Sequence, residues 1–151
     1  METIIRTDAS HPDFLLLVKE LNAFLSEIDG EEFDFYFQFN QLNAIKHTAI
    51  FYLENFPVAC GAIKQFDPGT MEVKRMFTRP EFRSRGIGMK VLNELEAWAG
   101  EMGYNRCILE TGARQPFAIA LYQKAGYRQI PNYGQYAGVE NSVCFEKWLP
   151  V

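Results

Sequence analysis

The sequence predicts an α+β fold, with α and β mixed, in which helices pack on a mostly antiparallel sheet. Strand-like and helix-like patterns alternate along the chain, and three strand-like runs follow one another between residues 48 and 78. No linker, repeat or low-complexity stretch interrupts the 151 residues. A chain of this length can bury one hydrophobic core, so we expect a single domain over residues 1–151.

The N-terminal third begins with a short strand and continues with an amphipathic helix. Thr3–Arg6 has strand character, and from Phe14 to Ile28 the apolar residues recur at the spacing of one helix face. Gly30 stands where this helix is expected to end. The aromatic segment Phe33–Ala44 fits a second, shorter helix, although its Phe and Tyr content also fits a strand.

Three strands are predicted next, at residues 48–53, 58–66 and 71–78. The segment Glu54–Pro57 resembles a hairpin connection, and Asp67–Thr70 contains the Pro-Gly pair of a turn. Such short connections join antiparallel neighbours, so these strands are expected to form a meander.

The C-terminal half alternates helices and strands. Apolar residues repeat at helical intervals from Ile87 to Met102, and Gly103 can end that helix. A strand at 106–111 and a helix at 116–125, which begins with Pro and closes at a Gly, come next. A final pair of strands is predicted at 127–130 and 143–148.

Composition limits the classes of function. The formal net charge of −4 argues against general nucleic-acid binding, but one short segment is basic and suits a small polyanionic ligand. Its cationic residues are Lys74, Arg75, Arg79, Arg83, Arg85 and Lys90. The first twelve residues do not resemble a signal peptide, and the longest aliphatic run is far shorter than the ~20 residues that cross a bilayer. We therefore expect a cytoplasmic protein without a membrane partner.

The cysteines and histidines do not suggest a metal site or disulfides. Cys60, Cys107 and Cys144 are odd in number and lie in apolar, strand-like runs, which favours reduced thiols in the core. A reactive thiol is the less favoured alternative. His11 and His47 have no Cys or His partner at ligand spacing, so no metal is expected.

A glycine-containing run, Arg83-Ser84-Arg85-Gly86-Ile87-Gly88, joins a predicted strand to a predicted helix. Glycines at i and i+2 let the backbone approach a ligand, and the free N–H groups of the first helical turn attract anions. The third glycine of a dinucleotide fingerprint is missing, and no Walker sequence occurs. The pair could also be a plain tight connection.

Two segments resemble the GCN5-related N-acetyltransferase (GNAT) superfamily. Arg83–Gly88 matches the Arg/Gln-x-x-Gly-x-Gly/Ala loop that receives the coenzyme A pyrophosphate, and Ala120–Tyr127 is similar to the second coenzyme A segment, Leu-Tyr-x-x-x-Gly-Phe/Tyr. The resemblance extends from about Pro57 to Leu149 and includes the order of the elements. It implies a twisted sheet of about six or seven strands flanked by helices on both faces.

The resemblance implies an enzyme that moves an acetyl group from acetyl-coenzyme A to a primary amine by direct attack in a ternary complex. The amine belongs to a small molecule, an amino acid or a protein. The alternative is a non-catalytic sensor or scaffold that binds acyl-coenzyme A. The oligomeric state stays open, and a homodimer is compatible with the resemblance.

Residues of the cofactor site are implied by the same resemblance. Backbone amides from Arg83 to Met89 would receive the pyrophosphate, the strand Met76–Thr78 would pair with the pantetheine amides, and Arg79 or Arg85 would reach the ribose 3′-phosphate unless they are ordinary surface charges. The expected set is Met76, Phe77, Thr78, Arg83, Ser84, Arg85, Gly86, Ile87, Gly88, Met89 and Tyr122.

Three residues are candidates for catalysis. Glu72 stands at the same offset from Gly86 as the catalytic glutamate of the histone-modifying branch, so it is our first candidate for the general base, and Glu110 is the second. The resemblance implies that Tyr122 is the general acid and that the main-chain N–H near Phe77 is the oxyanion donor. The alternatives are a solvated glutamate or a partner of Lys74 for Glu72, and a core-packed ring for Tyr122.

Two further segments could shape the acceptor site. Glu27–Asp34 contains five carboxylates that could steer a cationic amine, although a solvated acidic loop is the favoured interpretation. Tyr133–Tyr136, together with Asn141, forms a polar and aromatic loop that could line the acceptor site or serve only as a rigid turn.

Overall fold

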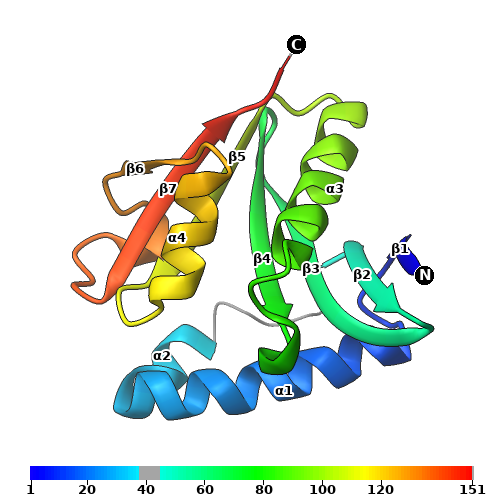
Figure 1. Ribbon diagram of the computed structural model, residues 1–151. Coiled ribbons are helices and arrows are strands. Elements are labelled where there is room, and N and C mark those ends of the chain that lie inside the picture. Colours follow the sequence, from blue (N-terminus) through cyan, green and yellow to red (C-terminus); the bar gives the residue numbers. More distant parts are fainter. Residues whose placement is uncertain (38–44, 151) are drawn as a thin grey trace. The chain divides into compact units, whose positions relative to one another are not determined.

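The computed structural model describes residues 1–37 and 45–150. The strands are β1 (Glu2–Thr7), β2 (His47–Leu53), β3 (Phe56–Asp67), β4 (Thr70–Thr78), β5 (Arg106–Gly112), β6 (Arg128–Ile130) and β7 (Ser142–Trp148) (Figure 1). The α-helices are α1 (Pro12–Asp29), α2 (Phe33–Phe37), α3 (Ile87–Glu101) and α4 (Pro116–Lys124). Short 3₁₀ turns are η1 (Gly30–Glu32), η2 (Pro80–Phe82) and η3 (Gly134–Tyr136).

Seven strands form one mixed sheet in the order β1-β2-β3-β4-β5-β7-β6. The pairs β1–β2, β2–β3, β5–β7 and β6–β7 are antiparallel, whereas β4 and β5 pair in parallel through Thr70–Glu72 and Arg106–Ile108. The predicted fold class is therefore confirmed. The ambiguous aromatic segment is helical over Phe33–Phe37, and its remainder, residues 38–44, lies outside the described residues. The 3₁₀ turns were not expected from the sequence.

The chain divides into two compact units, of which the first contains Met1–Lys64 and Lys74–Leu95 and the second contains Gln65–Val73 and Glu96–Val151. β4 and α3 contribute residues to both units. None of the described helices combines the length and the apolar character needed to cross a membrane.

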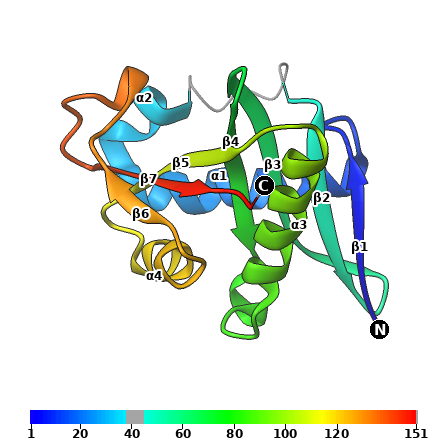
Figure 2. The ribbon, with the colours of Figure 1, turned by 90° about the horizontal axis from the view of Figure 1, so that it is seen from above.

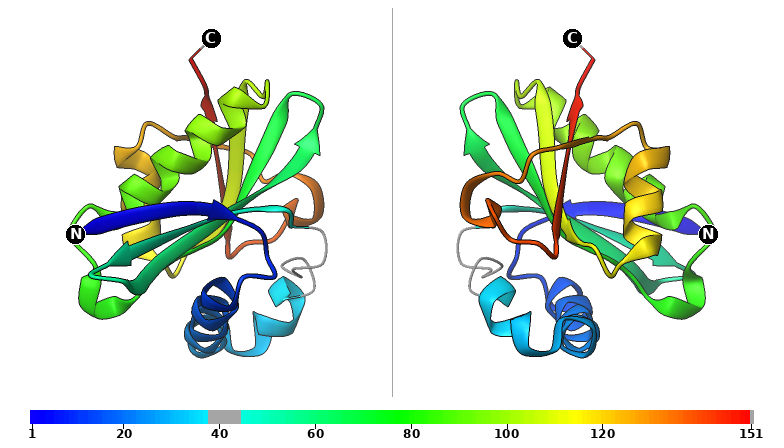
Figure 3. Two further views of the ribbon diagram at one scale, coloured as in Figure 1. Left: turned by 90° about the vertical axis from the view of Figure 1, so that its right-hand side faces the viewer. Right: turned by 90° about the vertical axis from the view of Figure 1, so that its left-hand side faces the viewer.

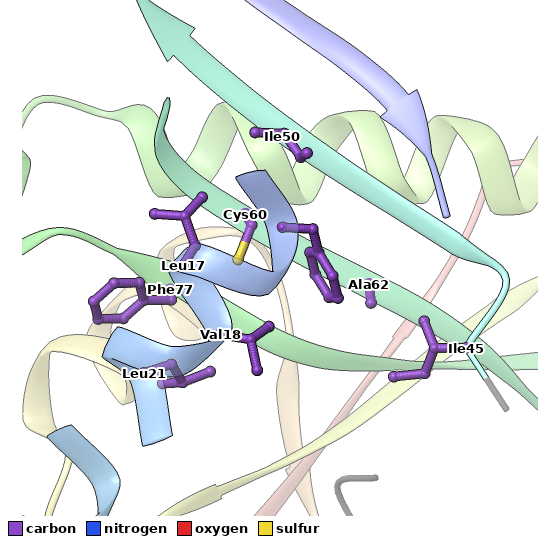
Figure 4. Packing of buried hydrophobic residues seen from close by; sticks show 9 residues of the cluster. Leu17, Val18, Leu21, Ile45, Ile50, Cys60, Ala62 and Phe77 are labelled. Atoms are coloured by element: carbon purple, nitrogen blue, oxygen red, sulfur yellow. The ribbon is translucent and has the colours of Figure 1, made fainter. Parts of the chain in front are cut away.

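The core of the first unit lies between α1 and the strands. The apolar face of α1 packs against side chains from β2, β3 and β4 (Figure 4). The buried members of this cluster are Phe14, Leu17, Val18, Leu21, Ile45, Ile50, Cys60, Ala62 and Phe77. α1 begins where the His11 side chain accepts a hydrogen bond from the Asp13 N–H, and it ends at Gly30, whose φ of +53° favours glycine. The predicted helix is thus confirmed.

The opposite face of the same strands is covered by α3 (Figure 3). Side chains alternate between the two faces of a strand, so Cys60 and Ala62 face α1 while Gly61 faces the other way. At Gly61, an added Cβ would lie 2.8 Å from Leu95 Cδ1 and 3.1 Å from Val91 Cγ1, which places α3 directly over this glycine. Helices therefore cover both faces of this part of the sheet, as the resemblance implies.

Replacing Gly61 by Ala is expected to lower the free energy of unfolding by about 1–3 kcal/mol, because the extra methyl overpacks a filled core. Its Cβ would lie only 2.4 Å from Met76 Sδ, so the sulfur must move. The measurement is urea denaturation of both proteins. Gly100→Ala in α3 is the matched control: its Cβ meets no atom within 4 Å, and the helix should gain about 0.5–1 kcal/mol. Equal stability of Gly61→Ala and wild type would contradict this packing.

The second unit is built on the long antiparallel pair β5–β7, with β6 on the outer side of β7 (Figure 2). α4 packs on this pair through Tyr122, whose ring centroid lies 6.2 Å from that of Phe145 on β7. Gly126 has a φ of +95° and follows α4, as the predicted helix end requires.

Candidate active site

The loop that precedes α3 ends in backbone N–H groups for which no partner is recorded among residues 1–37 and 45–150. Ser84 and Gly86 have φ values of +65° and +78°, so the chain passes through two left-handed residues before the helix starts. The Lys90 N–H donates to the Gly86 carbonyl at 3.2 Å, which is the first bond of the helix. The N–H groups of residues 87–89 therefore precede the intrahelical ladder and are available to an anion.

The arginines around this loop differ in what they contact. Arg83 Nε donates to the Thr78 carbonyl at 3.0 Å, and its guanidinium lies 4.9 Å from the Phe24 ring centroid, so this side chain ties the loop to β4 and α1. Arg79 forms an ion pair with Glu20 at 3.0 Å. Arg85 is exposed, and among the described residues its guanidinium has no carboxylate partner, which makes it the better placed of the two candidates for a phosphate.

The basic segment is not one continuous positive surface. Lys74 and Arg75 are buried, at 8% and 6% exposure, and Lys90 forms an ion pair with Glu2 of β1 at 2.7 Å. Burial removes Lys74 and Arg75 from the surface, and ion pairs compensate the charges of Arg79 and Lys90, so the prediction that the whole segment suits a polyanion was too broad. The part of the segment that still suits a polyanionic ligand is the loop before α3.

In the second unit, Glu72 is paired with a tyrosine. The Tyr133 hydroxyl donates a hydrogen bond to Glu72 Oε2 at 2.6 Å, and Glu72 is only 7% exposed. Burial, followed by the charge of Glu72, raises the pKa of Tyr133 above its ordinary value, so this phenol stays protonated and the bond persists at neutral pH. Glu72 is therefore not the solvated strand glutamate of the alternative interpretation.

Glu72 and Glu110 share one face of the sheet. Glu72 is in register with Ile108 in the parallel pair β4–β5, and Glu110 follows Ile108 by two residues and pairs with Cys144 on β7. Residues in register, or two apart along a strand, point to the same side. Burial raises the pKa of Tyr136, and the charges of Glu110 and then Glu72 raise it further. Both carboxylates therefore lie near the loop that contains Tyr133 and Tyr136.

Tyr122 approaches from the other face. It packs against Phe145, which alternates with Cys144 along β7, and its ring lies 5.9 Å from that of Tyr127. Tyr122 is 6% exposed, and burial, with a further contribution from the Glu110 charge, raises its pKa. The phenol thus carries its proton throughout the neutral range, which is the starting state of a general acid.

The three expected catalytic residues belong to the second unit, where Glu110 lies within electrostatic reach of Tyr122 and both carboxylates lie within reach of Tyr136. Residues 76–78 and 83–89 of the expected cofactor site belong to the first unit. The bond between Glu72 and Tyr133 was not expected, since 61 positions separate the two residues. The sequence signal was the aromatic loop after β6. Asn132 holds that loop by donating to the carbonyls of Val139 and Ser142, both at 2.9 Å.

The cysteines have the character of core residues. All three are buried and free, and burial raises the pKa of Cys60 and Cys107 to about 12 and that of Cys144 to about 11. Thiolates are therefore scarce at neutral pH, which argues against the reactive-thiol alternative. Within residues 1–37 and 45–150, no group of three His, Cys, Asp or Glu side chains could hold a metal ion.

The acidic segment Glu27–Asp34, which begins in the last turn of α1, is largely exposed, as the solvated interpretation expects. Glu27, Glu31 and Asp34 face solvent, while Asp29 is buried at 5% exposure at the end of α1. Steering of an amine by these charges stays a prediction.

Comparisons with known proteins agree with this architecture. The family model described as "Acetyltransferase (GNAT) family" matches residues 14–127. An IAA acetyltransferase of Azospirillum brasilense is 32% identical over 97% of both chains. A crystal structure from Klebsiella pneumoniae, described as an acyl-CoA N-acyltransferase, is 29% identical, covers 99% of this chain and 98% of its own, and superposes with a TM-score of 0.82. A GNAT acetyltransferase of Elizabethkingia anophelis with acetyl-CoA bound shares the fold at 20% identity, 98% coverage of both chains and a TM-score of 0.69.

These matches define an acyltransferase by family and by fold. The chain belongs to the GNAT acetyltransferase family, because the family model covers residues of both compact units and the Azospirillum relative spans nearly the whole chain.

Proposed function

We propose that this protein transfers the acetyl group of acetyl-coenzyme A to a primary amine by direct attack in a ternary complex. The observation that carries the proposal is the set of proton-transfer groups in the second unit. Two carboxylates, Glu72 and Glu110, share one face of the sheet, and the protonated phenol of Tyr122 lies within reach of the Glu110 charge. Amine acetylation needs both a proton acceptor and a proton donor.

Each group has a role in this proposal. Glu72, held by Tyr133, accepts the proton that the attacking ammonium must lose, with Glu110 as the second candidate. As the nitrogen bonds to the acetyl carbon and the carbon–sulfur bond breaks, Tyr122 donates its proton to the departing sulfur. The N–H near Phe77 stabilises the oxyanion. The backbone donors of residues 84–89 hold the pyrophosphate, since the Arg83 N–H that was expected to join them donates to the Pro80 carbonyl at 3.3 Å, and Met76–Thr78 hydrogen-bond the pantetheine amides.

The test is release of free thiol from acetyl-coenzyme A across a panel of small amines, amino acids and peptides, with the acetylated product identified by mass. Amine-dependent thiol release supports the proposal. Binding heat without turnover of any amine would favour a coenzyme A sensor or scaffold. No heat at millimolar acetyl-coenzyme A would overturn both functions.

Replacing Gly86 by Ala is expected to weaken acetyl-coenzyme A binding about 5- to 30-fold, as measured by titration calorimetry. A Cβ at this residue meets no atom within 4 Å, so the effect comes from the φ of +78°, which costs a non-glycine residue about 1–2 kcal/mol. Alanine favours a negative φ, so the loop is less populated in the conformation that presents its N–H groups to the pyrophosphate.

Gly103→Ala separates this effect from a general loss of stability. Gly103 also has open space and a positive φ of +94°, but it follows the far end of α3. It should lower the free energy of unfolding by a similar amount and leave the affinity unchanged. Equal affinities of Gly86→Ala and Gly103→Ala would remove the loop from the cofactor site.

The proposal also includes the extent of the domain and its cellular location. We take residues 1–151 as one acetyltransferase domain, because β4 and α3 run through both compact units. A cytoplasmic location is supported by three buried, reduced cysteines, since disulfides belong to oxidising compartments.

A further inference from the structure

Arg75 is a buried cation in the middle of β4. Its side chain is 6% exposed, and its φ of +58° lies in the left-handed region, which a non-glycine residue adopts at a cost of about 1–2 kcal/mol. Local irregularities of this kind re-aim a side chain and occur beside active sites. The Cys60 thiol donates to the Arg75 carbonyl at 3.5 Å on the α1 side of the sheet.

The guanidinium has few partners for its five donors. It donates a hydrogen bond to the Asn22 side-chain oxygen on α1, and Asn22 is a neutral amide. Within residues 1–37 and 45–150, the structure records no carboxylate paired with Arg75, and its buried Nε has no acceptor. Glu20 is paired with Arg79 instead. The undescribed residues 38–44 contain no Asp or Glu.

A buried charge of this kind calls for a counter-charge. Arginine is almost never buried without a partner, because removing a cation from water is costly unless an anion compensates it. Burial lowers the pKa of Arg75 to about 10, which still leaves the guanidinium charged at neutral pH. The compensating anion is therefore absent from the described part of the protein itself.

We propose that Arg75 and Asn22 bind a carboxylate of the acceptor, so that the acetylated substrate is an amine that also bears a carboxylate, as an amino acid does. This inference rests on the acetyl transfer proposed above. A planar guanidinium matches a carboxylate in shape, and one positive charge balances one negative charge.

The position of Arg75 in the chain favours the acceptor over the cofactor as the source of this anion. The next residues, Met76–Thr78, are expected to run along the uncharged pantetheine, and the pyrophosphate is assigned to residues 84–89. Glu72, the first candidate for the base, precedes Arg75 by three residues in the same strand. The acceptor is thus the reactant whose charged group should meet this strand.

The first experiment compares L-amino acids with their carboxamides as acceptors of the wild-type enzyme. Each kcat/KM is corrected for the fraction of free amine, because the carboxylate raises the pKa of its neighbouring amine. We expect the carboxylate form to be preferred about 10- to 100-fold, the effect of one charge-assisted hydrogen-bonded pair. Arg75→Gln should abolish the preference, whereas Lys19→Gln, which removes an exposed charge from α1, should keep it.

Asn22→Asp tests the inference without deleting the arginine. The new carboxylate lies on the guanidinium, so the thermal unfolding midpoint should rise while the preference for carboxylate acceptors falls at least about tenfold. A purely structural Arg75 predicts the higher midpoint with the preference unchanged, and that result would overturn the inference even if Arg75→Gln does not fold.

The outcomes separate this inference from the proposed function. Thiol release with equal kcat/KM for carboxylates and carboxamides, or only with amines that lack a carboxylate, would overturn the Arg75 assignment and leave acetyl transfer intact. No turnover of any amine would overturn both.

Discussion

Replacing Tyr122 by Phe is expected to lower kcat about 10²- to 10⁴-fold, while the affinity for acetyl-coenzyme A stays near that of wild type. The phenol is buried and protonated, and Phe fills the same space against Phe145 without the proton. The loss corresponds to about 3–5 kcal/mol of the barrier. Positioning of the two reactants, worth up to ~7–11 kcal/mol, survives, so turnover should be slowed and not abolished.

The measurement is kcat at saturating concentrations of both substrates, with calorimetry for the affinity. Tyr127→Phe is the matched control, because it removes a hydroxyl from the neighbouring ring. Tyr127 donates to Glu96, which keeps its ion pair with Lys147 at 2.8 Å, so this variant should lose some stability and keep its kcat. An unchanged kcat in Tyr122→Phe would remove the acid role from this residue.

Replacing Glu72 by Gln is expected to lower kcat/KM about 10²- to 10⁴-fold at neutral pH, because the amide cannot accept the proton of the attacking ammonium. Gln has the same shape and can still accept the Tyr133 hydrogen bond, so the fold should be retained. The loss should shrink as pH rises through the pKa of the amine substrate, since an amine that is already deprotonated needs no base. A pH profile of kcat/KM measures this recovery.

Glu110→Gln distinguishes the two candidate bases. Both carboxylates lie on one face of the sheet, so both variants remove one negative charge from the same surroundings. A large loss in Glu110→Gln together with near wild-type activity in Glu72→Gln would transfer the role to Glu110. A loss in Glu72→Gln that is independent of pH would indicate positioning in place of proton transfer.

Much of the fold could be predicted from local patterns. The helical spacing from Phe14 to Ile28 became α1, and Gly30 ended it with a positive φ. Glu54 and Asn55 formed the hairpin turn between β2 and β3 with φ values of +50° and +67°, as a two-residue turn requires. The aromatic segment Phe33–Ala44 stayed ambiguous, because large aromatic residues suit helix and strand equally well when no periodicity is present.

The candidate site was predicted only in part. The glycine loop and Tyr122 were visible as motifs, but the partner of Glu72 was not, because Tyr133 comes from a loop 61 positions away. Arg75 was grouped with a basic segment expected to suit a small polyanionic ligand, whereas the left-handed backbone of β4 and the packing of α1 bury it against Asn22. A sequence pattern within a few residues of Arg75 does not predict its burial or its contact with α1.

The sequence by itself determined the strands, the three longer α-helices and the glycine loop for which anion binding is proposed, since these depend on backbone preferences and spacing within about ten residues. Only the tertiary structure decided which charges are buried and which side chains meet. Strand register places Glu72 beside Glu110, and the contact between β4 and α1 leaves Arg75 with an amide as its recorded partner. Those pairings arise from contacts between distant segments, which local preferences do not encode.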